Sequence, residues 1–530
     1  MADNLEPKGH AERQAFLADD APDGDDDLVV YAGKHASRKT PRTPNRVQFD
    51  LHPAVMGEPD SDDDDDDYDD DDDDNDDGRG GQHSHRVPLL TDMEAPSVAV
   101  ANALGGGPGG DGDGERLEQQ MRRPKSGLRS AFVNMANSII GAGIIGQPYA
   151  MRQAGLAAGV LLLAGLTVVI DWTIRLIVVN SKLSGRSSFQ GTVEHCFGRP
   201  GLVAISAAQW VFAFGGMVAF GVIVGDTIPH VLAAAWPGAA AVPVVGLLTD
   251  RRVAIAVLVM GVSYPLTLYR DMAKLAKAST FALAGMLVIV ATVLVQGLLV
   301  PPEARGSLGA PQLTVNGGGM LQAIGVISFA FVCHHNSLLI YGSLKTPTMD
   351  NFSRVTHWST GVSLLACLAM ALAGFLAFGD KTLGNVLNNF PPDNAMVNVA
   401  RLCFGLNMLT TLPLEAFVCR EVMLTYWFPG EGFRRGRHVA LSTGLVALAA
   451  AASLLTCDLG AVFELVGATS AVAMAYVLPP LCYMRLATRG WRTYAAGAVV
   501  AFGLAVMVTS VAQAVGKMVN GTSNDAAQCV

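Results

Sequence analysis

The sequence has little charge, few cysteines and no alternating apolar pattern, and each shortage argues against a class of protein. Only 16% of the 530 residues are charged and 50% are hydrophobic, which disfavours a water-soluble enzyme or a nucleic-acid-binding protein. The eight cysteines form no C-x-x-C pair, so neither a disulfide scaffold nor a zinc or redox motif is indicated. The first residues, MADNLEPKGHAERQAF, lack the apolar core of a secretory signal peptide, and we expect the N-terminus in the cytosol.

The net charge of −10 averages two unlike parts of the chain. Residues 1–120 hold 32 acidic and 10 basic residues, a net of −22, whereas residues 121–530 hold 15 acidic and 27 basic residues, a net of +12. The first part contains an aspartate run from Ser61 to Gly78 and has too little apolar surface to fold, so we predict a disordered acidic cytosolic tail over 1–120. The run lacks the spaced ligands of a calcium loop, so we interpret it as a solvated, self-repelling segment.

The tail contains candidate phosphorylation sites. Ser61 precedes six aspartates and suits an acid-directed kinase, while Thr40 and Thr43 each precede proline and suit a proline-directed kinase. These sites predict that the tail binds kinases or other cytosolic regulators.

Eleven apolar runs of about 18–25 residues recur in residues 121–518, the length that a helix needs to cross a lipid bilayer. They show no strict alternation, so we expect helices and not barrel strands. The predicted spans are 129–153, 157–181, 203–229, 252–269, 279–300, 319–342, 356–378, 396–419, 438–456, 461–484 and 493–516. Basic residues number 19 in the loops on the N-terminal side and 7 on the other, which favours a cytosolic N-terminus and a short non-cytosolic tail, 519–530.

The loop after the second span has its own helical pattern. Phe189, Val193, Cys196 and Phe197 follow helical spacing. We predict a short amphipathic helix lying on the inner membrane face.

The first span contains small and polar residues that are unusual in a membrane helix. They are Asn134, Asn137, Ser138, Gly141, Gly143, Gly146 and Pro148. Small residues could simply allow close helix packing. Gly-x-Gly beside two asparagines and before a proline favours instead a helix that breaks halfway and exposes backbone N–H and C=O groups to a cavity.

The sixth span carries His334, His335 and Asn336 behind Phe329 and Phe331. Polar residues inside a membrane are costly and are therefore functional candidates. Histidine titrates near neutral pH and could carry a proton. The alternative is that one or both histidines only form hydrogen bonds between helices.

Interruptions in spans one and six have the five-helix offset of an inverted repeat. We therefore predict an all-α membrane protein of eleven helices, with a five-plus-five inverted repeat, broken helices 1 and 6, and a binding site at the membrane midplane. Half-helix N-termini offer N–H groups to a carboxylate, and freed carbonyl groups suit a cation. This combination suits an amino acid zwitterion.

The eighth span adds Asn407, Thr410 and Thr411, whose oxygen atoms could face a cation. Threonine in a membrane helix more often bonds to its own backbone. Glu415 in the same span is expected to be buried.

Charged residues in other spans are weaker candidates. Asp171 and Arg175 stand four residues apart, and we expect them to form a structural pair. Asp226 and Glu464 are further acidic candidates.

Several stretches of the chain are long and distinctive. They read NSIIGAGIIGQPYAMRQAG from Asn137, YPLTLYRDMAKLAKAS from Tyr264 and SFAFVCHHNSLLIYGSLKTPT from Ser328, with looser matches from Arg401 and Phe463. The chain resembles, over about 125–515, the amino acid/auxin permease family of secondary amino acid transporters. Within it, the sodium-coupled neutral amino acid transporters and the fungal vacuolar amino acid transporters are most similar.

The resemblance implies the eleven-helix inverted-repeat fold and a set of site residues. It assigns Na⁺ binding to Asn137 and to Thr410 or Thr411. The substrate carboxylate would lie against the first break, and the sixth-helix break would complete the site. The implied substrate-binding residues are Ser138, Gly141, Ala142, Gly143, Phe331, Cys333, His334 and Asn336. Gln147 departs from the family pattern, and it could change substrate choice or only bond to a neighbour.

The predicted function is secondary active transport of neutral amino acids, with Na⁺ or H⁺ as the coupling ion and no other cofactor. Asn137 with a threonine permits Na⁺, while His334 and His335 permit a proton. The acidic tail resembles those of fungal vacuolar members, which favours a vacuolar or other endomembrane over the plasma membrane. The alternative is an amino acid sensor that signals through its tail. A membrane enzyme is disfavoured, because adjacent histidines on a helix point about 100° apart and cannot share one metal ion.

Overall fold

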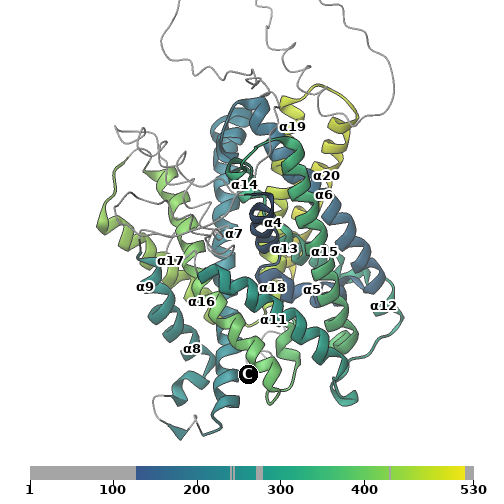
Figure 1. Cartoon of the computed structure of the whole chain (residues 1–530), viewed down its shortest axis with the longest axis vertical. Helices are drawn as coiled ribbons and strands as arrows, with labels where there is room; N and C mark the ends of the chain where they lie inside the picture. Colours follow the sequence, from purple (N-terminus) through teal and green to yellow (C-terminus); the bar gives the residue numbers. More distant parts are fainter. Residues whose placement is uncertain (1–126, 239–240, 243–244, 270–277, 429–430, 520–530) are drawn as a thin grey trace, which may run out of the picture. The chain divides into compact units, whose positions relative to one another are not determined.

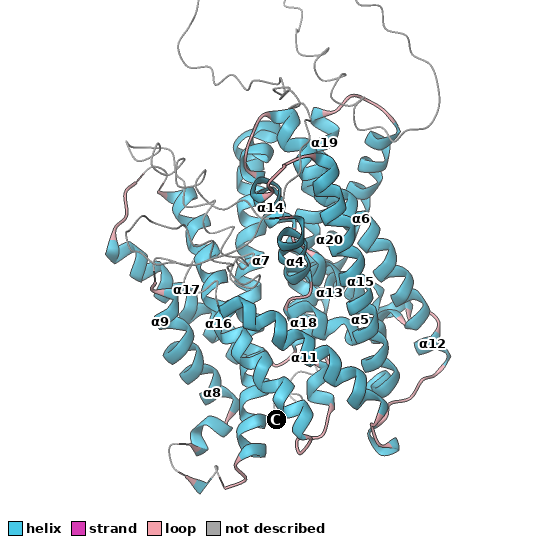
Figure 2. Ribbon diagram, viewed as in Figure 1, coloured by secondary structure: helices cyan, strands magenta, loops and turns pink. Residues whose placement is uncertain are grey.

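The computed structural model describes residues 127–238, 241–242, 245–269, 278–428 and 431–519, excluding the side chains of 278–283 and 514–519. These residues form helices and contain no strand (Figure 2), in agreement with the predicted all-α fold. The predictions for the acidic tail 1–120 and for the chain beyond Val519 lie outside the described residues.

Eight helices in the described part of the chain are long and apolar enough to cross a membrane, judged by length and composition. They are Leu156–Ser184, Phe189–Ala235, Gly317–Ser343, Met349–Lys381, Ala395–Trp427, Arg435–Leu455, Leu459–Leu486 and Trp491–Gln513. The bent pair Leu128–Ile139 and Ala142–Ala154 makes a ninth if it counts as one span. A multi-pass helical fold is thus confirmed, while the total of eleven and the inverted repeat stay predictions.

The α-helices are labelled in chain order in Figure 1. They are α4 (Leu128–Ile139), α5 (Gln147–Ala154), α6 (Leu156–Ser184), α7 (Phe189–Ala235), α8 (Arg251–Leu258), α9 (Tyr264–Thr267), α11 (Ala278–Leu298), α12 (Ala310–Leu313), α13 (Met320–Phe331), α14 (Ser337–Ser343), α15 (Met349–Phe378), α16 (Ala395–Trp427), α17 (Arg435–Leu455), α18 (Leu459–Val466), α19 (Leu478–Leu486) and α20 (Trp491–Val519). The predicted spans 252–269 and 279–300 fall on α8 with α9 and on α11. A π-helical turn, η4 (Val259–Ser263), separates α8 from α9.

The first predicted span is interrupted, as expected from its small and polar residues. The 3₁₀ helix η1 (Ala142–Gly146) stands between α4 and α5, and the helix axis bends by 43°. Gly141 has an extended backbone with φ −73° and ψ −151°. The buried Gln147 donates from Nε2 to the Gly143 carbonyl at 3.1 Å. Gln147 therefore bonds to its neighbour and stabilises the break.

The sixth predicted span is also interrupted. α13 ends at Phe331, Val332 is extended with φ −74° and ψ 102°, and the 3₁₀ helix η7 (His334–Asn336) leads into α14. The last carbonyl groups of α13 consequently lose their helical partners. α13 packs on η1 and α5, so the two interrupted spans lie against each other.

The helix predicted after the second span is the first part of α7. Ser188 caps its N-terminus, and Gly198, with φ 65°, ends this part in a kink. Phe189, Val193 and Cys196 are buried in the protein. Most of the apolar face therefore packs against the protein, while Phe197 is 36% exposed, and the position of this helix at the inner membrane face stays a prediction.

Gly467 allows α13 to approach the π-helical turn η10 (Gly467–Ala471) closely. A Cβ atom on Gly467 would overlap the Gly325 carbonyl oxygen. We expect Gly467→Ala to lower the melting temperature in detergent, because overpacking costs about 1–3 kcal/mol. As a control, Gly444→Ala in α17 adds a Cβ with nothing within 4 Å and should not lower it. Equal melting temperatures for the two variants would contradict the close contact.

Candidate functional site

The two interrupted spans meet α7 and α16 around a cavity of about 130 Å³. α16 packs along α7, which forms the wall opposite the breaks. A cavity of this size holds several water molecules or a small solute. It is lined by Asn137, Ser138, Gly141, Ala142, Gly143, Phe212, Gly216, Phe220, Met286, Phe329, Ala330, Val332, His335, Asn336, Asn407, Met408, Thr411, Leu414 and Glu415.

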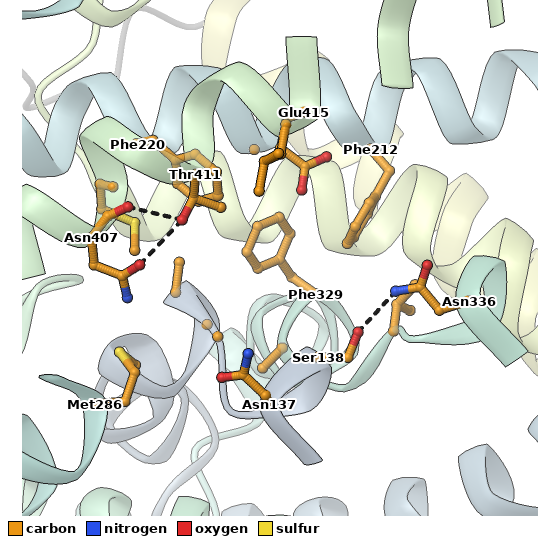
Figure 3. Close-up of a pocket in the computed structure, with 18 of the residues that line it drawn as sticks. Asn137, Ser138, Phe212, Phe220, Met286, Phe329, Asn336, Asn407, Thr411 and Glu415 are labelled. Carbon is orange, nitrogen blue, oxygen red and sulfur yellow. Dashed lines mark hydrogen bonds between the residues drawn. The ribbon is translucent and has the colours of Figure 1, made fainter. Parts of the chain in front are cut away.

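A hydrogen bond joins the two breaks beside the cavity. Asn336 Nδ2 donates to Ser138 Oγ at 2.9 Å (Figure 3). Gly141, Ala142 and Gly143 line the cavity next to this bond. The first N–H groups of a helix have no intrahelical acceptor, and the positive end of the helix dipole lies there. This part of the cavity can therefore accept a carboxylate.

The two histidines have separate surroundings. His334 is fully buried, and its Nε2 lies 2.9 Å from Thr173 Oγ. The same hydroxyl lies 3.1 Å from the Ile170 carbonyl oxygen, so His334 takes part in a hydrogen bond between helices. His335 lines the cavity, and its ring centre lies 5.7 Å from that of Phe212. Only His335 is placed to meet a solute.

The two candidate threonines on α16 also differ. Thr411 lines the cavity and Thr410 does not. Thr411 Oγ donates to the Asn407 backbone oxygen at 2.8 Å and lies 3.1 Å from Asn407 Oδ1 (Figure 3). Thr410 Oγ donates to the same backbone oxygen at 2.9 Å. A hydroxyl that donates to its own helix keeps its lone pairs, so Thr411, Asn137 and Asn407 can offer oxygen atoms to a monovalent cation.

The structure brings together seven of the eleven site residues predicted from the sequence. They are Asn137, Ser138, Gly141, Ala142, Gly143, Asn336 and Thr411. Phe331, Cys333, His334 and Thr410 do not line the cavity. The first three of these are fully buried in the packing around the second break, so they can act on a solute only through their neighbours.

Several lining residues are absent from the predicted set. Phe212, Gly216 and Phe220 of α7 and Met286 of α11 lie in apolar runs, where nothing in the sequence separates a cavity face from a lipid face. Glu415, expected to be buried, lines the cavity. An acidic residue inside a membrane span is the signal that could have identified it.

Other intramembrane charges join helices away from the cavity. Asp171 pairs with Arg175 at 3.0 Å, as predicted, and its other oxygen lies 2.9 Å from His357 Nδ1. Asp226 pairs with Arg251 at 3.0 Å. None of these five residues lines the cavity. These ion pairs and hydrogen bonds therefore hold the helices together and do not contact a solute in the cavity.

The chain is similar in sequence to known membrane transporters. The model of the family described as "Transmembrane amino acid transporter protein" matches residues 124–516. "Vacuolar amino acid transporter 2" of Saccharomyces cerevisiae is 40% identical over 417 residues, which are 76% of this chain and 86% of that protein. "Putative sodium-coupled neutral amino acid transporter 11" of Danio rerio is 37% identical over 369 residues, 69% of this chain and 80% of that protein.

Among solved structures, a manganese transporter from Eremococcus coleocola aligns over 83% of this chain and 90% of that chain. The identity is 13% and the TM-score is 0.44. This likeness is too remote to support an argument about the site.

Proposed function

The chain belongs to the family of transmembrane amino acid transporter proteins, and from this premise we propose that it moves neutral amino acids across a membrane by alternating access coupled to Na⁺ or H⁺. The protein is a transporter and not an enzyme. The observation that carries the proposal is the cavity at which two interrupted helices meet α7 and α16.

The substrate carboxylate, in this proposal, lies against the first break. Ala142 and Gly143 present N–H groups at the start of η1, and the Ser138–Asn336 hydrogen bond lies beside them. Helix dipoles and fixed N–H groups favour a negative charge there without reorganisation. Phe331 acts from behind the lining, where its burial holds the second break in place. Cys333 and His334 have the same supporting role.

The coupling ion has two candidate sites in the cavity. Na⁺ would take oxygen atoms from Asn137 and Thr411, with Asn407 nearby. A proton would use His335, because His334 is held by Thr173 outside the lining. The zebrafish relative is named "Putative sodium-coupled neutral amino acid transporter 11", and this name supports the first alternative.

The protein is a multi-pass membrane protein, and we propose a vacuolar or other endomembrane location. The support is the name of the yeast relative, which is vacuolar. Within this proposal the tail 1–120 is cytosolic and binds regulators, 121–518 form the transport domain, and 519–530 lie on the non-cytosolic side. The sensor alternative has no support, because the relatives are named as transporters.

Uptake into proteoliposomes tests the proposal directly. We expect a labelled neutral amino acid to enter under an imposed Na⁺ gradient or an imposed pH gradient. If Na⁺ drives uptake, Asn137→Ala and Thr411→Ala should each reduce its stimulation about tenfold or more, because each removes an oxygen ligand to a charge. The measurement is the initial uptake rate with and without each gradient.

Thr410→Ala is the matched comparison for the second variant. Its hydroxyl lies one residue away and outside the cavity, so it should retain a larger Na⁺ stimulation than Thr411→Ala. Stimulation by the pH gradient alone would assign H⁺ as the coupling ion. Binding of amino acids without uptake under either gradient would contradict the transport proposal and favour the hypothesis of an amino acid sensor.

A further inference from the structure

Glu415 places a carboxylate in the cavity wall. It belongs to α16, one helical turn after Thr411, and it is the only acidic side chain among the described residues that line the cavity. Lysine and arginine are absent from that same lining. Among the described residues, none forms a hydrogen bond or an ion pair with the Glu415 carboxyl group, and His335 is the titratable side chain that shares the lining with it.

Three aromatic rings line the same cavity as this carboxyl group. In Figure 3, Glu415 lies between Phe212 and Phe220 of α7, with the ring of Phe329 below it. Gly216 faces the same place, where an added Cβ would lie 3.7 Å from Glu415 Cγ and 3.9 Å from Phe220 Cζ. The glycine therefore leaves room beside the carboxylate. Aromatic faces attract an organic cation through the ring quadrupole, and a carboxylate adds a full charge.

A neutral amino acid has no charged group to pair with the Glu415 carboxyl group in the cavity wall. A zwitterion has no net charge, and its own carboxylate is accommodated at the first break. An ionised carboxylate without a partner is costly in apolar surroundings. A cation beside Glu415 would therefore stabilise its ionised form, and the side chain of a neutral amino acid supplies none.

We propose that Glu415, Phe212, Phe220 and Phe329 form a subsite for the cationic side chain of a basic amino acid, such as the ammonium of lysine or the guanidinium of arginine. This inference rests on the proposed transport function and extends its substrates to basic amino acids. In the view of Figure 3, Glu415 lies across the cavity from Asn137 and Ser138. An amino acid whose carboxylate binds at the first break would extend its side chain in that direction.

A bare coupling ion fits this corner less well. Hard cations bind to several oxygen atoms. The neighbours of Glu415 on α7 and α13 are phenyl rings and a glycine, which supply no oxygen from their side chains. Asn137, Asn407 and Thr411 supply the several oxygen atoms that such an ion needs.

Exchange in proteoliposomes tests the subsite without any ion gradient. Vesicles containing the full-length protein are preloaded with leucine, and entry of labelled leucine is measured against unlabelled leucine, lysine or arginine outside. We expect lysine and arginine to compete in the wild type. Glu415→Gln should reduce the potency of lysine relative to leucine about tenfold or more, because a charge-assisted contact is lost.

Three further variants separate charge from packing. Glu415→Asp keeps the charge and should recover part of the lysine preference. Gly216→Val fills the space beside the carboxylate and should weaken lysine more than alanine as a competitor. Glu421→Gln removes an acid from the same helix outside the cavity lining and should keep the wild-type ratio of lysine to leucine.

The inference is overturned if the wild type exchanges leucine but neither lysine nor arginine competes. An unchanged potency ratio in Glu415→Gln also overturns it. Loss of pH-driven leucine uptake in Glu415→Gln, with basic amino acids excluded from the wild type, would instead make Glu415 the carrier of the coupling proton. Absence of exchange with every amino acid would count against the proposed function itself.

Discussion

Replacing Gly143 by valine is expected to lower amino acid uptake about a hundredfold, because displacement of a site by about 1 Å can cost that much in rate. A Cβ atom on Gly143 would lie 2.5 Å from both Cα and Cβ of Ala330. Ala330 is one residue before the end of α13, so the clash falls where the two interrupted helices meet. The backbone must shift, and the Ser138–Asn336 hydrogen bond should break with it. Initial uptake rate and melting temperature in detergent measure the effect.

Gly141→Ala is the matched control within the same break. An added Cβ on Gly141 would have Ser138 O at 3.8 Å and Asn137 O at 3.9 Å, which are ordinary contacts. It should keep a melting temperature near that of the wild type. Gly143→Ala should show a smaller loss of uptake than Gly143→Val. Uptake at the wild-type rate in Gly143→Val would show that transport does not need the close approach of α13 and η1.

Arg401→Met is expected to destabilise the protein and reduce uptake. Arg401 is 1% exposed, and its Nη2 donates to the carbonyl groups of Leu387 and Phe390 at 2.8 Å each. Methionine keeps the apolar stem but removes both hydrogen bonds; the Leu387 carbonyl keeps the Phe390 N–H at 3.4 Å, whereas the Phe390 carbonyl is left unpaired, at about 1–3 kcal/mol. Leu387 belongs to η9 (Val386–Asn389), which contacts η1, so the effect should reach the first break.

Two variants test the cause of that loss. Arg401→Lys keeps the charge but not the planar fork of donors, so its melting temperature should fall between those of the wild type and Arg401→Met. Arg434→Met removes an arginine whose side chain is 76% exposed and should change stability little. Thermal unfolding in detergent compares all three. A melting temperature for Arg401→Met equal to that of Arg434→Met would mean that the buried hydrogen bonds do not stabilise the fold.

Local pattern in the sequence predicted the helices and their interruptions. The length and apolar character of each run are properties of neighbouring residues, so they could be read without knowing the fold. The breaks have the same origin, because glycine, asparagine and proline change backbone preference where they stand. The family followed from stretches such as the one that begins at Asn137. The structure and the comparisons agree with these three conclusions.

Tertiary structure decided which side chains meet inside the cavity. Thr410 and Thr411 are adjacent, yet successive residues on a helix point about 100° apart, and only the packing of α16 on α7 turns Thr411 inward. Likewise, the adjacent His334 and His335 point in different directions, so that His335 faces the cavity and His334 faces Thr173. An apolar membrane span has no polar face to reveal its rotation. The acidic side chain of Glu415 marks it as a candidate in the sequence, but the arrangement of the surrounding helices decides that it lines the cavity.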